Sequence, residues 1–111
     1  MDPPATYRCR NCQTPIAYRD ELLSKSYMVV VDPFGIQAKT GQAFLFSDAR
    51  NIVFGQKQET NLITGVYTIA SIFCSNCGEE LGWKYLQASE ARQKFKEGKF
   101  ILELSKISKH F

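Results

Sequence analysis

Runs of apolar and β-branched residues, separated by turn-forming residues, recur along the chain. Across residues 65–73, Tyr67 and Ile69 fall on one side of an extended backbone, while Thr68 and Ala70 fall on the other. This alternation with a period of two predicts a strand. The same reasoning predicts strands at residues 27–31, 43–46, 51–54 (ended by Gly55), 65–73, 81–86 and after Gly98, where Phe100, Leu102 and Leu104 share a face.

Helical periodicity is scarce in this sequence. Only residues 88–95 carry enough good helix formers for a helix, of about two turns. The chain has 111 residues, 44% of them apolar and 23% charged, which is the balance of a globular protein. We therefore expect a single domain over residues 1–111, mainly β, with one short helix.

The charge is nearly balanced, with 14 Lys and Arg against 11 Asp and Glu and a net charge of +3. A phosphate-binding protein concentrates its basic residues on one face, whereas here they are scattered. Two small clusters, Lys94 with Lys96 and Lys99, and Lys106 with Lys109, are predicted to lie on a solvated surface. This distribution disfavours a nucleic-acid partner.

The N-terminal stretch MDPPATYRC has no basic region followed by an apolar run, so it does not predict a secretory signal. No stretch approaches the roughly 20 apolar residues that span a bilayer. We therefore expect an intracellular protein, in the nucleus or the cytoplasm, with no membrane partner. In that reducing setting cysteines are more often thiols or metal ligands than permanent disulfides.

The four cysteines fall into two pairs, Cys9 and Cys12 in CRNC and Cys74 and Cys77 in CSNC. Two residues between the members of a pair let one tight turn aim both sulfurs at one point, so two such turns can complete a tetrahedron around Zn²⁺. A zinc with four thiolates has no open position and holds the fold without activating water. We predict one structural Zn²⁺ that clips together distant parts of a sheet-forming chain.

The residue after each pair also bears on this prediction. Gly78 can take a positive φ angle that turns backbone amides toward the thiolates, whereas Gln13 is expected to give no such help. Two other uses of the pairs stay open, a thioredoxin-like redox CxxC and two disulfides in an oxidising compartment. The redox use is disfavoured because CSNCGEELGW does not continue as a convincing helix.

The segments CRNC, ELLSKSY, TGQAFLF, NIVFG, TNLITGVYTIASIFCSNCGEELGWKY and QKFKEGKFILE, in this order, resemble the Yippee family of small zinc proteins. The resemblance runs from Cys9 to about Leu104 and implies a β-tent fold, in which two antiparallel sheets meet at a zinc clamped by both CxxC pairs. Similar domains are the thalidomide-binding part of cereblon, the Mis18 proteins and, more remotely, methionine sulfoxide reductase B. One departure is MVVVDPFGIQAKT (residues 28–40), several residues longer than is usual, which is expected to lengthen a hairpin or loop.

The resemblance also implies a ligand site. CSNCGEELGWKY resembles the cereblon stretch after its second cysteine pair, which places Trp83 on a position of that domain's aromatic cage. Tyr67 and Tyr85 are candidates for further aromatic walls, so Trp83, Tyr67 and Tyr85 are the expected ligand-binding residues. Zinc would fix the backbone of residues 74–77 and thereby hold an aromatic wall in place. A purely structural role for Trp83 stays open, because aromatic residues often lie in cores.

Three functions compete. The expected one is a noncatalytic, zinc-stabilised binding or regulatory module for a protein or small ligand, and the resemblance implies protein partners, with a ubiquitin-ligase or cell-cycle assembly as one candidate. The second is a sulfoxide-reductase-like enzyme on the same fold, which needs a nucleophilic thiolate beyond the four zinc ligands. The sole histidine, His110, lies beside the C-terminus and is not expected to act as a base. The third is a nucleic-acid-binding zinc protein, which the scattered charge disfavours.

Overall fold

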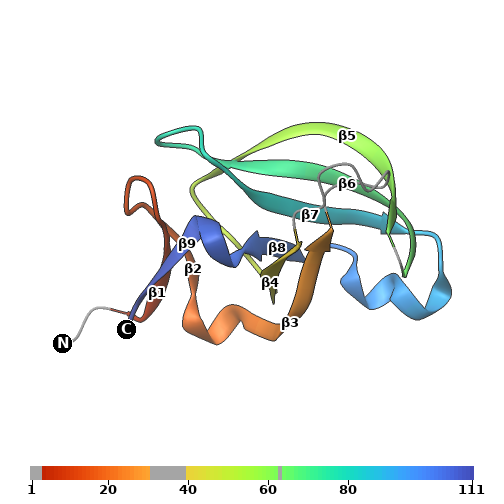
Figure 1. Ribbon diagram of the computed structural model, residues 1–111, viewed down its shortest axis with the longest axis horizontal. Coiled ribbons are helices and arrows are strands. Elements are labelled where there is room, and N and C mark those ends of the chain that lie inside the picture. The colour runs from red at the N-terminus through yellow and green to blue at the C-terminus, as the bar shows by residue number, and fades with distance from the viewer. Residues whose placement is uncertain (1–3, 31–39, 63) are drawn as a thin grey trace.

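The computed structural model describes residues 4–30, 40–62 and 64–111 (Figure 1). These residues form nine strands: β1 (Thr6–Cys9), β2 (Pro15–Tyr18), β3 (Leu22–Val30), β4 (Thr40–Phe46), β5 (Ile52–Leu62), β6 (Gly65–Cys74), β7 (Glu80–Ala88), β8 (Phe100–Glu103) and β9 (Ile107–His110). The helical segments among them are short 3-10 helices: η1 (Arg19–Glu21), η2 (Ala91–Lys96) and η3 (Leu104–Lys106). None of the helices in this part of the chain has the length and apolar character needed to cross a membrane.

The strands form two antiparallel sheets, as predicted. A three-stranded sheet has the order β2-β1-β9, and a six-stranded sheet has the order β3-β4-β8-β7-β6-β5. Figure 1 shows the small sheet at one end of the molecule, beside the loop that joins β6 to β7. The fold is therefore mainly β, with two sheets that meet near the cysteine loops.

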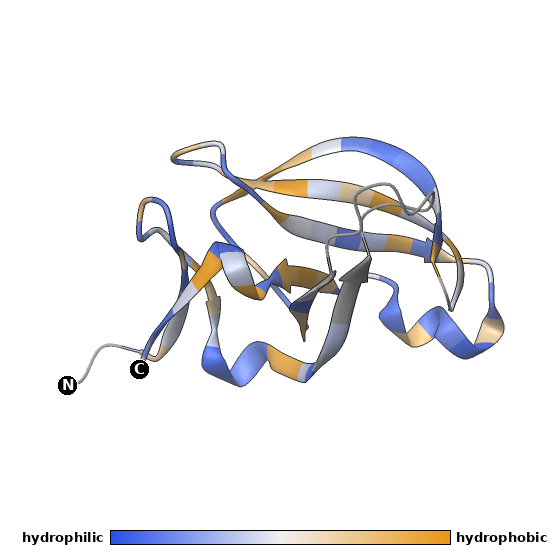
Figure 2. Ribbon diagram, viewed as in Figure 1, coloured by the Kyte–Doolittle hydropathy of each residue, from blue (hydrophilic) through white to orange (hydrophobic). Residues whose placement is uncertain are grey.

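The core consists of two clusters on opposite faces of the large sheet. In β4, Phe44 and Phe46 belong to one cluster and Ala43 and Leu45 to the other, because successive side chains of a strand point to opposite faces. The first cluster also holds apolar residues of the small sheet, which covers that face: Tyr7, Ile16, Ala17 and Ile107. Burial on both faces explains why residues 43–46 of β4 and 100–102 of β8 are apolar at every position, as the orange of β8 shows (Figure 2).

Strand β6 passes from one cluster to the other. Tyr67 and Ile69, early in the strand, belong to the second cluster, while Ile72 and Cys74, at its end, belong to the first. This confirms that Tyr67 and Ile69 lie on the face opposite to Ile72, as predicted. One face of β6 is buried in the first half of the strand, and the other face in the second half. At its C-terminal end β6 turns Cys74 toward the small sheet.

The prediction that Gly55 ends a strand is wrong. Strand β5 continues to Leu62 through a register shift between Phe54 and Lys57 in its pairing with β6. A Cβ on Gly55 would lie 3.1 Å from the ring of Phe73, so the glycine allows a close approach at this irregularity. Beyond it β5 is hydrophilic (Figure 2) and forms one edge of the sheet, and this polar stretch hid the strand from the apolar pattern.

The helix predicted at residues 88–95 exists only as the 3-10 helix η2, Ala91–Lys96. Ala88 still belongs to β7, and Glu90, the residue before η2, makes no side-chain cap hydrogen bond. A segment of this length is too short to be a stable α-helix by itself, and here the surrounding structure sets its geometry.

The described ends of the long segment at residues 28–40 belong to β3 and β4. Met28 pairs with Gln42, Val29 with Gly41 and Val30 with Thr40. Residues 31–39 lie outside the described residues.

Candidate metal centre and its surroundings

The first cysteine pair lies in a tight loop between β1 and β2. The backbone N–H of Gln13 donates to the carbonyl oxygen of Cys9 at 2.8 Å, and the N–H of Cys9 donates to the carbonyl oxygen of Thr14 at 2.8 Å. These two bonds close the loop and fix the direction in which Cys9 and Cys12 leave it.

The second pair repeats this turn between β6 and β7. The N–H of Gly78 donates to the carbonyl of Cys74 at 2.9 Å, and the N–H of Cys74 donates to that of Glu79 at 2.8 Å. Both loops place the residue after the second cysteine at positive φ, 68° for Gln13 and 79° for Gly78. The expectation that Gln13 gives no help is therefore wrong, because it adopts the left-handed conformation despite its Cβ.

The two loops bring the four predicted ligands together. The sulfurs of Cys9, Cys12, Cys74 and Cys77 all lie within 4.8 Å of one another. Two close contacts join different loops, Cys9 to Cys77 at 3.6 Å and Cys12 to Cys74 at 3.5 Å. A tetrahedral zinc with bonds of about 2.3 Å needs sulfurs roughly 3.8 Å apart. All four residues are free cysteines, so the donor set fits one tetrahedral metal ion.

The two thiols of the first loop ionise differently. Burial raises the pKa of the Cys9 thiol to about 12, against the opposing effect of the Cys12 and Asn11 backbone N–H groups. Hydrogen bonds from the Thr14 hydroxyl (3.1 Å) and the Asn76 side chain lower the pKa of Cys12 to about 6. Cys12 therefore offers a thiolate at neutral pH, whereas Cys9 must lose a proton when a metal binds.

Asn51 connects the two cysteine loops, a role that sequence analysis missed. Its side-chain amide donates to the carbonyl of Pro15, just after the first loop, at 2.8 Å, and its own carbonyl accepts from the N–H of Ser75 in the second loop at 2.9 Å. Its φ of 57° is left-handed, a conformation that Asn tolerates better than most residues. An Asn next to a predicted turn was the available signal.

Arg50 ties the small sheet to the loop before β5. Its guanidinium makes two hydrogen bonds to the carboxylate of Glu21, at 2.7 and 2.9 Å, and lies 4.2 Å from the ring centre of Tyr18. Burial alone would raise the pKa of Glu21, but Arg50 and the N–H of Tyr18 outweigh it, so the pKa is lowered.

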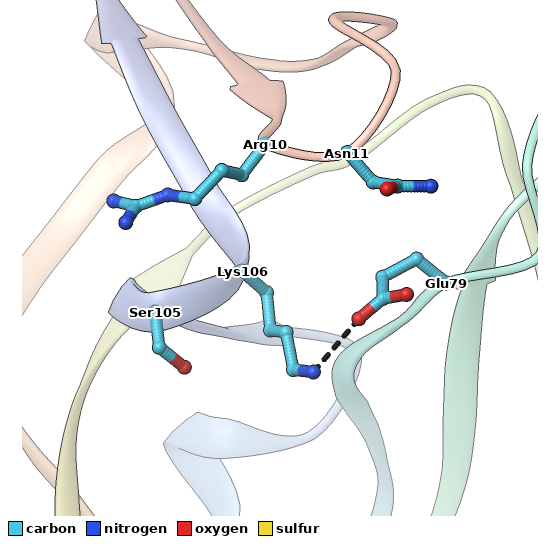
Figure 3. Close-up of a pocket in the computed structure, with 5 residues that line it drawn as sticks. All are labelled: Arg10, Asn11, Glu79, Ser105 and Lys106. Carbon is cyan, nitrogen blue, oxygen red and sulfur yellow. Dashed lines mark hydrogen bonds and ion pairs between the residues drawn. The ribbon is translucent and has the colours of Figure 1, made fainter.

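A shallow cavity of about 290 Å³ lies beside the metal centre, lined by Arg10, Asn11, Glu79, Ser105 and Lys106 (Figure 3). Lys106 and Glu79 form an ion pair of 2.8 Å across it, and Arg10 donates to the carbonyl of Ile107 at 3.0 Å. The volume is at the lower end for small-molecule sites, and its charged groups already have partners within the protein.

The three aromatic residues of the predicted ligand site also lie together. The ring centres of Tyr67 and Tyr85 are 5.0 Å apart, and Trp83 packs edge-to-face on Tyr85 at 6.1 Å. Tyr67 and Tyr85 are 1% and 2% exposed, and burial raises the pKa of the Tyr85 hydroxyl. The Trp83 N–H, which lies near that hydroxyl, is buried and has no acceptor among the described residues. The ligand-binding role of these residues stays a prediction.

One basic residue departs from the expected solvated surface. Lys96 is only 5% exposed, and its ammonium group lies among the tyrosines of this cluster. Nothing in the local sequence distinguishes Lys96 from its neighbours Lys94 and Lys99, since its burial depends on the packing of η2 on the sheet.

Two antiparallel sheets joined by loops that bring together four cysteine sulfurs define a small β protein with a four-cysteine metal centre. A family model described as "Yippee zinc-binding/DNA-binding /Mis18, centromere assembly" matches residues 5–110. The chain belongs to this Yippee–Mis18 family, as the sequence resemblance implied.

Two relatives illustrate the similarity. A yippee-like protein of Arabidopsis thaliana is 48% identical over 106 residues, covering 96% of this chain and 92% of the relative. Yippee-like protein 3 of Danio rerio is 44% identical over 103 residues, covering 93% of this chain and 79% of the relative. The crystal structure of the Mis18 "Yippee-like" domain matches with a TM-score of 0.67 at 14% identity, covering 98% of this chain and 97% of that one, and shows the fold alone.

Proposed function

We propose that this chain is a noncatalytic binding module, held together by one structural Zn²⁺, that presents a surface to a protein partner. The convergence of four sulfurs within 4.8 Å, donated by loops of the two sheets, is the observation that supports this most directly. A metal with four protein thiolates has no position left for water or substrate. Bound zinc would supply a tetrahedral crosslink between the sheets, which is a structural contribution.

Zinc is the metal that this donor set favours. Four soft thiolates in a tetrahedral arrangement select Zn²⁺ or iron over hard cations such as Mg²⁺ and Ca²⁺. The description of the family model also names zinc binding. Metal analysis of the protein purified under reducing conditions is expected to give one zinc per chain, and stoichiometric iron would contradict the assignment.

A sulfoxide-reductase-like enzyme is less well supported. Its chemistry needs a nucleophilic thiolate in addition to the metal ligands. The sequence has four cysteines, and all of them lie in the cluster. Thiol titration separates the two functions: a binding module shows no reactive thiol until zinc is released, whereas a reductase shows one with zinc in place.

The partner is proposed from the names of similar proteins. The family description mentions centromere assembly, and one similar fold is a domain of Mis18. From these names we propose that this chain binds a protein partner in the nucleus or cytoplasm. A ubiquitin-ligase or cell-cycle complex is the candidate assembly. The predicted contact region is the surface around Trp83, the part of the aromatic cluster that is partly exposed.

Affinity capture with zinc-loaded wild type, Trp83→Leu and Phe54→Leu tests this surface. Phe54 is a matched control, because it is 48% exposed and lies near Lys84, whose side chain points to the opposite face of β7 from that of Trp83. Trp83→Leu is expected to lose partners that Phe54→Leu keeps. Equal capture by all three proteins would contradict a role for the aromatic cluster, provided that zinc content is unchanged.

DNA binding is the second candidate, because the family description names it. The net charge of +3 gives it little support. Titration of the same zinc-loaded protein with duplex DNA at increasing salt decides: tight binding at physiological salt that weakens steeply as salt rises would favour DNA over a protein partner.

A further inference from the structure

The ammonium group of Lys96 occupies an aromatic cage within the protein. Its nitrogen lies 5.3 Å from the ring centre of Tyr27, 5.1 Å from that of Tyr67 and 5.6 Å from that of Tyr85. These distances are within the range in which the electron-rich face of a ring attracts a cation. Since Lys96 is only 5% exposed, water contributes little to the solvation of its charge.

The polar partners of this ammonium are hydroxyl groups. It donates to the hydroxyl of Tyr67 at 3.0 Å and to that of Thr64 at 3.3 Å. Within the described ranges, no carboxylate lies at ion-pair distance from it, although a buried charge is costly without compensation. The rings and two hydroxyls therefore do the work that a carboxylate does at most buried lysines, as in sites that recognise ammonium ligands.

The walls of the cage and its occupant come from separate parts of the fold. Tyr27, Tyr67 and Tyr85 belong to β3, β6 and β7 of the large sheet, and Tyr67 and Tyr85 also pack against each other. Lys96 is supplied by η2, the short segment that follows β7 at the far end of the molecule from the cysteine loops (Figure 1). The cage does not need η2 to hold its walls together.

The segment that supplies Lys96 buries little of its own surface. Within η2, Lys96 is the one buried residue, while Phe95 beside it is 56% exposed. The Lys94 ammonium donates to the carbonyl of Ala88 at 2.6 Å, and the Glu97 carboxylate accepts from the N–H of Ala88 at 2.9 Å. Just after η2, the N–H of Gly98 donates to the carbonyl of Tyr85 at 2.7 Å, and the N–H of Tyr85 donates to the carbonyl of Lys99 at 2.9 Å. A short surface segment with so little buried area opens at a lower free energy than the whole domain.

We propose that Tyr27, Tyr67 and Tyr85 form a receptor for an alkylammonium group, that Lys96 is its resident and displaceable occupant, and that a lysine side chain of a partner protein is the external ligand. This deepens the proposed binding function and gives the predicted aromatic site a ligand class. The test uses purified protein and a small probe. Its failure would therefore not contradict the zinc centre or the binding of a protein partner, which are tested separately.

The test compares two probes on zinc-loaded full-length variants. N-acetyl-lysine methylamide carries the ammonium, and the norleucine analogue lacks it. Lys96→Ala empties the cage and is expected to bind the lysine probe at least tenfold more tightly than the norleucine probe, as read by thermal shift and by fluorescence of Trp83, the sole tryptophan. Arg92→Ala is the matched control from the same segment and is expected not to gain this binding, because the Arg92 side chain is exposed and lies outside the cage.

Two further measurements make each part of the proposal refutable. Adding Tyr27→Leu to Lys96→Ala is expected to weaken lysine-probe binding at least threefold, and equal binding of both probes by Lys96→Ala would overturn the receptor. If Lys96→Ala does not fold by itself, the titration is replaced by refolding with each probe and measuring the recovery of folded protein. Equal recovery with both probes would then overturn the receptor.

In wild type, excess lysine probe is expected to speed amide hydrogen exchange in residues 91–98 at least twofold. Unchanged exchange would overturn the claim that Lys96 is displaceable.

Discussion

The two cysteine loops have the same backbone conformation but differ in the residue that makes the turn. In the second loop Gly78 takes a φ of 79° without steric cost, whereas in the first Gln13 takes 68° with a Cβ in place. The left-handed conformation costs a residue with a Cβ about 1–2 kcal/mol. Hydrogen bonding and the convergence of ligands therefore impose this turn on either residue, and glycine only lowers its cost.

The largest expected effect is the loss of a ligand from either loop. Cys74→Ser is expected to lose the metal and the fold, because a structural zinc contributes about 10–16 kcal/mol and a domain's net stability is about 5–15 kcal/mol. Cys77→Ser should also lose zinc, and with it the same stabilisation, although Cys77 is exposed and Cys74 is buried. Zinc content and circular dichroism on heating measure both. An unchanged melting temperature in Cys74→Ser would contradict a structural metal.

The pH dependence of zinc affinity distinguishes the thiols within the first loop. Cys9, with a pKa raised to about 12, is protonated between pH 6 and 8 and must release its proton on binding, while Cys12, with a pKa of about 6, is largely ionised there. The affinity is therefore expected to rise with pH, by roughly tenfold per pH unit for each proton released.

Competition with a chelator at pH 6, 7 and 8 measures this slope. Thr14→Val removes the hydroxyl that donates to Cys12, so its pKa should rise and the slope should become steeper near neutral pH. A pH-independent affinity would show that all four thiols are ionised before the metal arrives.

Asn51 tests how far the two loops depend on each other. Asn51→Ala loses the hydrogen bond to Pro15 and places a less tolerant residue at a φ of 57°, so a loss of about 1–2 kcal/mol in unfolding free energy is expected. Asn51→Gly keeps the backbone conformation and should lose only the hydrogen-bond part. If both variants matched wild type in chemical denaturation, Asn51 would not couple the loops.

The smallest effects come from exchanging the turn residues themselves. Gly78→Ala is expected to cost about 1 kcal/mol, and its Cβ would meet no atom within 4 Å, so the whole cost is backbone strain. Gln13→Gly should gain less than 1 kcal/mol, because relief of strain is offset by the greater freedom of glycine in the unfolded chain. Opposite signs in thermal unfolding are the expected result, and a stabilising Gly78→Ala would contradict the comparison.

The metal centre could be predicted from sequence because its signal is local. Two residues between cysteines fix the geometry of each turn, and the strand of residues 65–73 leads directly into Cys74. The central strands were predictable for the same reason, since alternation is visible over four or more residues. The sequence pattern predicts only the first part of the edge strand β5, up to Gly55, because the rest of the strand is exposed and polar.

Features set by tertiary packing could not be predicted. The small sheet consists of four-residue strands, which carry too short a pattern, and β9 pairs with β1 from the opposite end of the chain. The left-handed turn at Gln13 was hidden because glycine is the usual signal for a positive φ. The burial of Lys96 depends on partners distant in sequence, with no local cue. The family resemblance supplied Trp83, Tyr67 and Tyr85, but not the lysine that lies among them.

X-ray absorption at the zinc edge, together with zinc quantification on the folded and reduced protein, tests most directly whether one ion joins the two sheets. One zinc per chain with four sulfur neighbours at about 2.3 Å is the expected result. A folded chain with substoichiometric zinc, or zinc with nitrogen or oxygen neighbours in place of sulfur, would contradict the crosslink between the loops of Cys9 and Cys74.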